Sequence, residues 1–235
     1  MELSEKLKEE LIRKKIEAWQ RAKECREPGE EIASSTITIS SQPGSGGTLI
    51  AERLAGRLGY ELFDRFLVDV VAESAEISRD VVQTVEKERL HGIEDFISSL
   101  ISTNYLYPDV YLQHLMNVIH VIASHGRAVI VGRGSNFILP AGLRFSIRVV
   151  APEQARIQNV MKHYEVSENE ARHRVINRES KRAAFVRQSF HKDITDPLAY
   201  DLVVNTDAMD LDATAGCIHA FYAEFMGKDL PVPCS

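Results

Sequence analysis

Apolar and polar positions along the chain follow two patterns, one typical of buried strands and one typical of amphipathic helices. Short β-branched or continuously apolar runs indicate strands within a sheet, and apolar residues at intervals of three and four indicate helices. The runs that predict strands are 36–40, 60–64, 128–131, 143–150 and 200–206. Because helical segments separate these runs, the pattern predicts an α/β fold with a parallel sheet.

Helical spacing dominates residues 65–126, which are too many for a simple crossover between neighbouring strands. We interpret this range as a helical insertion that binds substrate. Within it a longer helix is expected to begin near Pro108, since proline suits the first helical position. Later helices are expected from Pro152, from the capping-box sequence 167–170, and over 211–226.

The first 30 residues have a helical pattern of their own. Residues 4–26 carry an apolar stripe and i,i+4 pairs such as Glu10 with Lys14, which together predict a helix. A proline-glycine pair ends it, so we expect 1–30 to be an N-terminal extension with a linker and 31–235 to be the main domain. The stripe packs on its own domain, which is the favoured interpretation, or binds a protein partner or a second subunit.

Composition limits the partners of this 235-residue chain. The hydrophobic fraction of 44% is enough for a core, and the net charge of −6 argues against nucleic acid or an anionic membrane as partner. The three cysteines form neither a metal-type spacing nor a disulfide framework. The beginning of the chain has no apolar signal core, and no segment is long enough to cross a bilayer. We therefore expect a cytoplasmic protein with a small partner.

A glycine-rich loop follows the first predicted strand and precedes a helix. The P-loop pattern is incomplete there, because Ser41 replaces its first glycine and Gly47 its lysine; the dinucleotide-binding pattern lacks its third glycine. Backbone N–H groups of such a loop can surround a phosphate, and a plain glycine turn is the alternative. The predicted phosphate-binding residues are Gly44, Ser45, Gly46, Gly47 and Thr48. The Thr48 hydroxyl is also the predicted Mg²⁺ ligand.

Charged residues follow two other predicted strands. Asp64, at the end of one, is placed to meet a substrate or a metal-bound water, and it also suits the N-cap of the next helix. Arg133 stands between two glycines after a buried strand. A guanidinium at that position suits phosphate, and a surface salt bridge is the alternative.

Three arginines share one face of a later predicted helix. Arg174, Arg178 and Arg182 are four residues apart, so their cationic groups repel one another unless an anion lies among them. A solvated basic face is the usual explanation of such a run. In a chain that is acidic overall, however, the stripe favours an anionic ligand.

Five motifs succeed one another along residues 36–226. They are Gly44-Ser45-Gly46-Gly47, Phe63-Asp64-Arg65, Val131-Gly132-Arg133-Gly134, Lys181-Arg182-Ala183-Ala184-Phe185 and the strand Tyr200 to Thr206. Together they resemble the bacterial cytidylate kinase-like family. The resemblance implies a three-layer P-loop NTPase-like fold with a five-stranded parallel sheet, a helical insertion and a helical lid, here 167–196.

The resemblance also implies ATP- and Mg²⁺-dependent phosphoryl transfer to CMP or a similar nucleoside monophosphate or small acceptor. It implies that Asp64 and Arg133 bind the acceptor. The residues that it assigns to the transferring phosphoryl group, as catalytic groups, are Arg174, Arg178 and Arg182.

The loop departs from the family pattern at Gly47, where related cytidylate kinases carry a lysine, and at Ser41-Gln42-Pro43. Both changes remove charge from the loop. Because phosphoryl transfer depends on neutralising developing charge, a second hypothesis is a nucleotide-binding regulatory protein with little or no kinase turnover. Its N-terminal helix would report the bound state to a partner.

Overall fold

Five parallel strands form the centre of the protein in a computed structural model that describes residues 10, 13, 14, 17, 36–73, 80–85, 91–93, 95, 97–99, 101 and 109–227. The strands are β1 (Thr36–Ser41), β2 (Glu61–Phe63), β3 (Ala128–Val131), β4 (Phe145–Val150) and β5 (Leu202–Asn205). Their order in the sheet is β2-β3-β1-β4-β5, which places β1 in the middle between β3 and β4. The predicted α/β fold with five parallel strands is confirmed.

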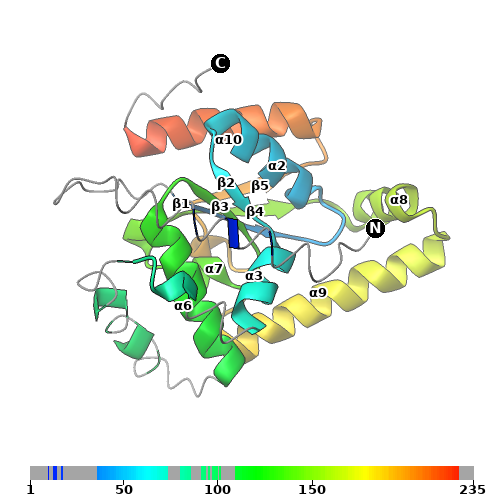
Figure 1. The fold of residues 1–235 in the computed structure, drawn as a ribbon. Helices are drawn as coiled ribbons and strands as arrows, with labels where there is room; N and C mark the ends of the chain where they lie inside the picture. The colour runs from blue at the N-terminus through cyan, green and yellow to red at the C-terminus, as the bar shows by residue number, and fades with distance from the viewer. Residues whose placement is uncertain are drawn as a thin grey trace.

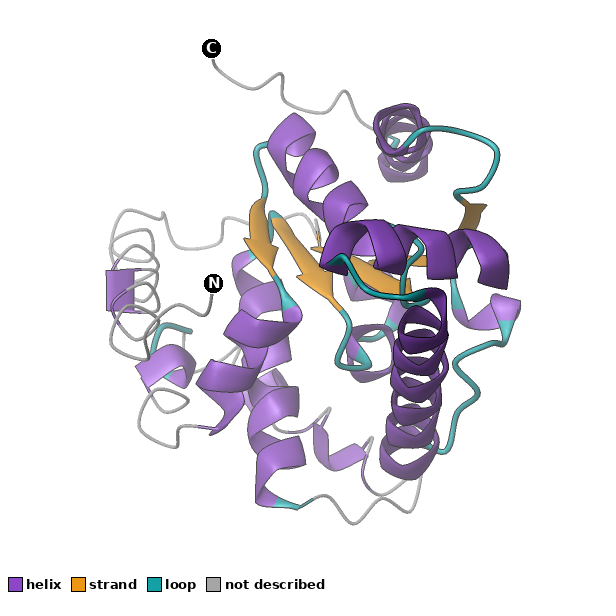
Figure 2. Ribbon diagram, turned by 90° about the vertical axis from the view of Figure 1, so that its right-hand side faces the viewer, coloured by secondary structure: helices purple, strands orange, loops and turns teal. Residues whose placement is uncertain are grey.

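Helices cover both faces of the sheet, so that the fold has three layers (Figure 1). On one face lie α2 (Gly47–Leu58) and α10 (Leu211–Met226), and on the other α3 (Arg65–Glu73), α6 (Val110–His125) and α7 (Ser135–Ile138). Two further helices, α8 (Glu153–Tyr164) and α9 (Glu168–Phe190), pack on each other, and α9 passes the carboxyl ends of the strands (Figure 2). Short 3-10 helices occupy Ala141–Leu143 and Pro197–Ala199. This is the P-loop NTPase-like arrangement.

Alternation of side chains along β1 and β4 gives the sheet one apolar and one partly polar face. Ile37, Ile39 and their neighbours pack with α2 and α10. The other face of the same strands carries the buried polar side chains of Ser40, Ser146 and Arg148. Of these, Ser40 and Arg148 are paired in register at the carboxyl end of β1, where a ligand site is expected in an open α/β sheet.

The observed elements differ from the predicted ones mainly at their ends. The strand predicted over 143–150 begins at Phe145, because a 3-10 helix includes Leu143. Helix α6 begins at Val110, and the Asp109 side chain caps it by accepting from the Leu112 N–H at 2.8 Å. The short helix α7 was not predicted, since four residues are too few for a periodic pattern.

Only Glu10, Arg13, Lys14 and Glu17 of the N-terminal extension are described, and these residues are helical. The predicted ion pair between Lys14 and Glu10 is present at 3.0 Å between exposed side chains. The apolar stripe lies outside the described residues, as do Pro108 and two of the three cysteines. Within the described ranges, no helix has both the length and the apolar character that crossing a membrane requires.

Candidate functional site

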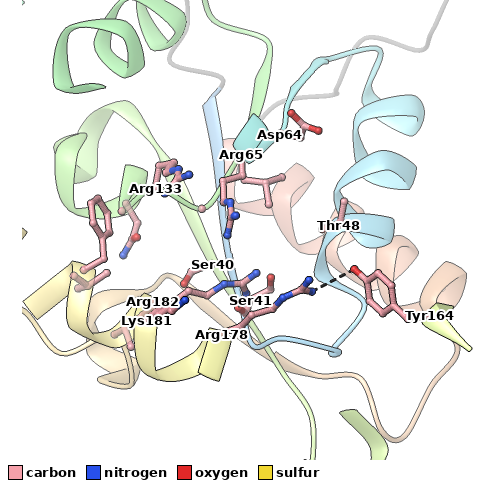
Figure 3. Close-up of a pocket in the computed structure, with 17 residues that line it drawn as sticks. Ser40, Ser41, Thr48, Asp64, Arg65, Arg133, Tyr164, Arg178, Lys181 and Arg182 are labelled. Atoms are coloured by element: carbon pink, nitrogen blue, oxygen red, sulfur yellow. Dashed lines mark hydrogen bonds between the residues drawn. The ribbon is translucent and has the colours of Figure 1, made fainter. Parts of the chain in front are cut away.

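A cavity of about 670 Å³ lies at the carboxyl ends of β1, β2 and β3, against helix α9 (Figure 3). It brings together five of the predicted site residues, which come from separate parts of the chain. These residues are Thr48, Asp64, Arg133, Arg178 and Arg182. The loop residues from Gly44 to Gly47 and Arg174 are not among the residues that line it.

The cavity is strongly cationic. Among the described residues that line it, the cationic ones are Arg65, Arg133, Arg178, Lys181 and Arg182, and the carboxylate is that of Asp64. In Figure 3 Arg65 and Arg182 lie beside Ser40 and Ser41, whereas Arg178 extends toward Tyr164. Such a concentration of positive charge, in a chain with a net charge of −6, indicates an anionic ligand.

Arg182 combines a backbone hydrogen bond with a lowered pKa. One of its terminal nitrogens donates to the Ser41 carbonyl oxygen at 2.5 Å, at the end of β1. Burial lowers the pKa of Arg182 to about 10, and nearby cations add to the effect. Those cations are Arg65, Arg148, Arg178 and Arg133. An anion among these groups would relieve their mutual repulsion and favour the charged form.

A buried arginine that was not predicted lies behind the cavity wall. Arg148, on β4, donates to the Ser40 hydroxyl at 2.7 Å, and its guanidinium lies 5.9 Å from the centre of the Tyr200 ring. Burial lowers the pKa of Arg148. Because Ser40 itself lines the cavity, Arg148 adds positive potential to the site from behind.

The glycine-rich loop between β1 and α2, predicted to bind phosphate, is fixed through its carbonyl groups. The Gly44 carbonyl accepts from the Asn159 side chain at 2.9 Å, and the Ser45 carbonyl accepts from the Thr206 hydroxyl at 3.0 Å. Gly46, in the left-handed conformation with φ of 79°, forms the N-cap position of α2. No acceptor in the described part of the chain takes the N–H groups of Gly46, Gly47 and Thr48, which remain for a ligand.

Ser41 and Gly47 are packed against each other. A Cβ atom added at Gly47 would lie 2.3 Å from the Ser41 Cβ and 2.7 Å from its Oγ, so the Ser41 side chain occupies the space that a side chain at position 47 would need. A lysine at Gly47 is therefore incompatible with the serine in its present place. The two departures from the P-loop pattern therefore depend on each other: the Ser41 side chain fills the space left by the missing side chain at Gly47. We call this pair of departures the packing exchange.

Gln42 connects the loop to α9. Its side-chain nitrogen donates to Glu179 at 2.9 Å, and its side-chain oxygen accepts from the Ala151 N–H at 3.0 Å. Glu179 also pairs with buried Arg156 at 3.0 Å. The loop and the arginine-bearing helix are thus joined by hydrogen bonds, which keeps α9 beside the end of β1.

Asp64 and Arg133 each make a structural contact, a helix cap or an ion pair, and each also lines the cavity. Asp64 caps α3, since its Oδ1 accepts from the Leu67 N–H at 2.8 Å, and it also lines the cavity. Arg133 forms an ion pair with Asp69 of α3, in which both side chains are mostly buried, and it too lines the cavity. The cap and the ion pair fix the two residues in place at the cavity wall.

The outer part of the arginine stripe surrounds Tyr164. Arg178 donates to the Tyr164 hydroxyl at 3.2 Å and lies over its ring. Arg174 pairs with Glu170 at 2.6 Å and lies 5.2 Å from the centre of the same ring, outside the cavity. Tyr164 itself lines the cavity.

Sequence reasoning did not identify most of the other cavity residues as site residues, and four of these carry polar or charged groups that matter to the function proposed below. They are Arg65, Asn136, Tyr164 and Lys181. Signals for two of them were present, since Arg65 directly follows Asp64 and Lys181 is three residues after Arg178, on the same helical face.

A family model and the curated relatives agree on one family, and one solved structure shares the fold. A model described as "Cytidylate kinase-like family" matches residues 36–208. The cytidylate kinase of Methanopyrus kandleri is 28% identical over 207 residues, which cover 84% of this chain and 98% of that protein. The cytidylate kinase of Staphylothermus marinus is 24% identical over 190 residues, covering 81% and 97%. The crystal structure of an uncharacterized protein from Eubacterium ventriosum has a similar fold, with a TM-score of 0.61 and 20% identity, covering 83% of this chain and 99% of the other.

Proposed function

This chain belongs to the cytidylate kinase-like family, and from that premise we propose that it transfers the γ-phosphoryl group of ATP to CMP or a similar nucleoside monophosphate or small acceptor. The observation that carries the proposal is the cationic cavity beside the free N–H groups of the phosphate loop. Phosphoryl transfer relies on positioning and charge neutralisation, which such a cavity offers. The two named relatives favour CMP as the acceptor.

The donor site in this proposal combines the loop with Thr48. The N–H groups of Gly46, Gly47 and Thr48 bind the donor phosphates at the positive end of α2. The described residues contain no cluster of three His, Cys, Asp or Glu side chains able to hold a metal ion. Mg²⁺ suits the site nonetheless, because it is commonly bound by few protein groups together with substrate phosphates and water, and Thr48 offers its hydroxyl. When bound, Mg²⁺ neutralises charge on the phosphates.

Helix α9 supplies the positive charge that the loop lacks at Gly47. Arg182 and Arg178 stabilise the transferring phosphoryl group, together with Arg133. A guanidinium has five N–H donors, so Arg182 can bind a phosphoryl oxygen while another of its N–H groups stays on the Ser41 carbonyl. Arg174 joins this catalytic set only when its ion pair with Glu170 opens.

The acceptor phosphate lies, in this proposal, at the ends of β2 and β3. Arg65 and Arg133 bind its oxygens from two sides of the cavity. Asp64 uses one oxygen to cap α3, and its second oxygen accepts a hydrogen bond from an acceptor hydroxyl.

A second candidate function is nucleotide-dependent regulation with little or no turnover. Two observations favour it: position 47 carries no charge, and Arg182 is bound to a backbone carbonyl. In that case the N-terminal extension would bind a protein partner or a second copy of the chain when nucleotide is present.

Formation of ADP from ATP and Mg²⁺ with a panel of nucleoside monophosphates separates the two functions. The kinase proposal predicts ADP formation that depends on the acceptor and is greatest with a pyrimidine nucleoside monophosphate. A mixture without acceptor measures background hydrolysis. Tight ATP binding without acceptor-dependent ADP would reject the kinase and favour the regulatory protein.

A further inference from the structure

The wall that α9 contributes to the cavity changes character along the helix. Its first cavity-lining residues are Arg178, Lys181 and Arg182, and one turn later come Phe185 and Val186. Val131 and Ile194 also line the cavity, and both are mostly buried hydrophobic residues. The cavity therefore has a cationic part and an apolar part, as a ligand with a phosphate and a ring requires.

Asn136 lies at the apolar end. It follows the turn that carries Arg133, and only 4% of its surface is exposed. Its neighbour Phe137 stacks on Phe190 at 6.0 Å, and a Cβ atom at Gly134 would lie 2.3 Å from the Phe190 ring. The end of α9 is thus packed tightly against α7, which fixes Asn136 beside the residues that form the apolar part.

Two buried donors at this place have no acceptor among the described residues. The side-chain nitrogen of Asn136 is one, since the nearby Tyr200 hydroxyl lies outside normal hydrogen-bond geometry, and Nε of Arg133 is the other. Both residues line the cavity. A buried donor without an acceptor is unfavourable and rare in folded proteins, so each is explained best by a ligand that supplies an oxygen or nitrogen acceptor.

We propose that Asn136 determines the specificity for the acceptor's base by donating a hydrogen bond to a carbonyl oxygen of the ring, while Phe185 and the neighbouring apolar side chains cover the ring. The proposal rests on the function proposed above and names the chemical class of its acceptor: a nucleoside monophosphate whose base bears a ring carbonyl.

The same lining predicts weak discrimination between cytosine and uracil. Reading the 4-amino group of cytosine requires an acceptor, and a carboxylate is the usual choice. Among the described residues that line the cavity, the carboxylate is that of Asp64, which caps α3 at the end of β2. Asn136 donates equally well to the 2-carbonyl oxygen, which both pyrimidines share.

The first test needs no variant. Isothermal titration of the full chain with CMP, UMP, AMP and ribose 5-phosphate should give affinities for CMP and UMP within about threefold of each other. AMP and ribose 5-phosphate should bind about tenfold more weakly, because adenine lacks a ring carbonyl and ribose 5-phosphate lacks a base. Equal affinity for CMP and ribose 5-phosphate would overturn the proposal.

The second test changes the donor to an acceptor. In Asn136→Asp the carboxylate repels the 2-carbonyl oxygen that cytosine and uracil share, so the ratio of CMP to ribose 5-phosphate affinity should fall from about tenfold to about one, and the ratio for UMP with it. Asn177→Asp, an exposed position on α9, adds the same charge outside the cavity and should leave both ratios unchanged. Unchanged ratios in folded Asn136→Asp, checked by circular dichroism, contradict the assignment; a variant that does not fold leaves the decision to the ligand series.

Measurements of binding and of turnover distinguish a failure of the Asn136 assignment from a failure of the proposed kinase function. Selective binding of CMP and UMP without ADP formation keeps the assignment of Asn136 and rejects the kinase. ADP formation with CMP, AMP and ribose 5-phosphate at similar affinity keeps the kinase and rejects the role of Asn136. Binding of none of the four compounds rejects both.

Discussion

The glycine-rich loop and helix α9 contribute to the same cavity by different means: the loop reaches it with its end residues Ser41 and Thr48, whereas α9 forms a wall of it. The loop from Ser41 to Thr48 has no charged side chain, and what it presents to a ligand is backbone N–H groups and one hydroxyl. Helix α9 presents the cationic side chains of Arg178, Lys181 and Arg182. The loop is fixed by hydrogen bonds to its carbonyl groups, whereas the helix contributes charged side chains, of which Arg182 is held in place by the Ser41 carbonyl oxygen.

This difference separates two tasks that one loop performs when the P-loop pattern is complete. In this chain the loop is suited to binding donor phosphates in the ground state, because its N–H groups are fixed before the ligand arrives. The arginines are suited to stabilising charge that develops later. Changes in the loop should therefore alter ATP affinity, and changes in α9 should alter kcat.

The largest effect is expected from Arg182→Ala. Loss of a preorganised cation at the transferring phosphoryl group should lower kcat about 10²- to 10³-fold, while the Kd for ATP changes less than about threefold. Steady-state rates and isothermal titration measure the two quantities. Arg187→Ala, on the same helix but outside the cavity lining, is the matched control and should retain wild-type kcat. Equal losses in kcat and ATP affinity would show that Arg182 binds the ground state.

Gly46→Val should act on ATP affinity, in contrast to Arg182→Ala, which acts on kcat. It should weaken ATP binding at least about tenfold. Gly46 has φ of 79°, which a β-branched residue rarely adopts, and a Cβ atom there would lie 2.6 Å from Leu211 Cδ2. Titration with ATP measures the change. Gly56→Ala, in the last turn of α2 with no atom near its Cβ position, should bind like wild type. Unchanged affinity in folded Gly46→Val would remove the phosphate assignment from the loop.

Gly47→Lys tests the packing exchange. The new side chain must displace Ser41, so the free energy of unfolding should fall by about 1–3 kcal/mol, as measured in urea. The double variant Ser41→Gly with Gly47→Lys should recover most of that loss, since the two positions share one space. Additive effects of the two changes would mean that the contact between these residues is unimportant.

Arg174→Ala should have the smallest effect on the reaction, with kcat within about threefold of wild type. Its guanidinium is bound to Glu170 and Tyr164 outside the cavity, and exposed ion pairs of this kind contribute little. The same rate measurement checks it. A loss as large as that of Arg182→Ala would mean that α9 moves until the whole arginine stripe faces the phosphates.

Local patterns were sufficient to predict the strands, most helices and the position of the phosphate loop. Periodicity depends on neighbouring residues, so β3 was predicted with its observed bounds, and so was α10. The rule that ligands lie at the carboxyl ends of parallel strands pointed to Asp64 and Arg133, and the pattern of the glycine-rich loop pointed to Thr48; the structure places all three along one cavity.

Features that depend on contacts through space could not be predicted in the same way. Arg148 occupies a strand position whose importance appears only when its face of the sheet is known. The exchange between Ser41 and Gly47 joins positions six residues apart through a turn, and each looks like a separate defect in the sequence. Asn136 stands out only because its buried nitrogen has no acceptor among the described residues.

The central claim is that α9 carries the charge which a P-loop lysine would supply, and returning a lysine to the loop tests it most directly. The pair Ser41→Gly and Gly47→Lys is introduced both into Arg182→Ala and into the wild-type protein. The change in kcat that the pair causes is then measured in each background. The account predicts that the lysine restores kcat at least about tenfold in Arg182→Ala and changes it less than about threefold in wild type, because one developing charge needs one of the two cations. An equal change in both backgrounds, or no recovery in a folded protein that binds ATP, would contradict it.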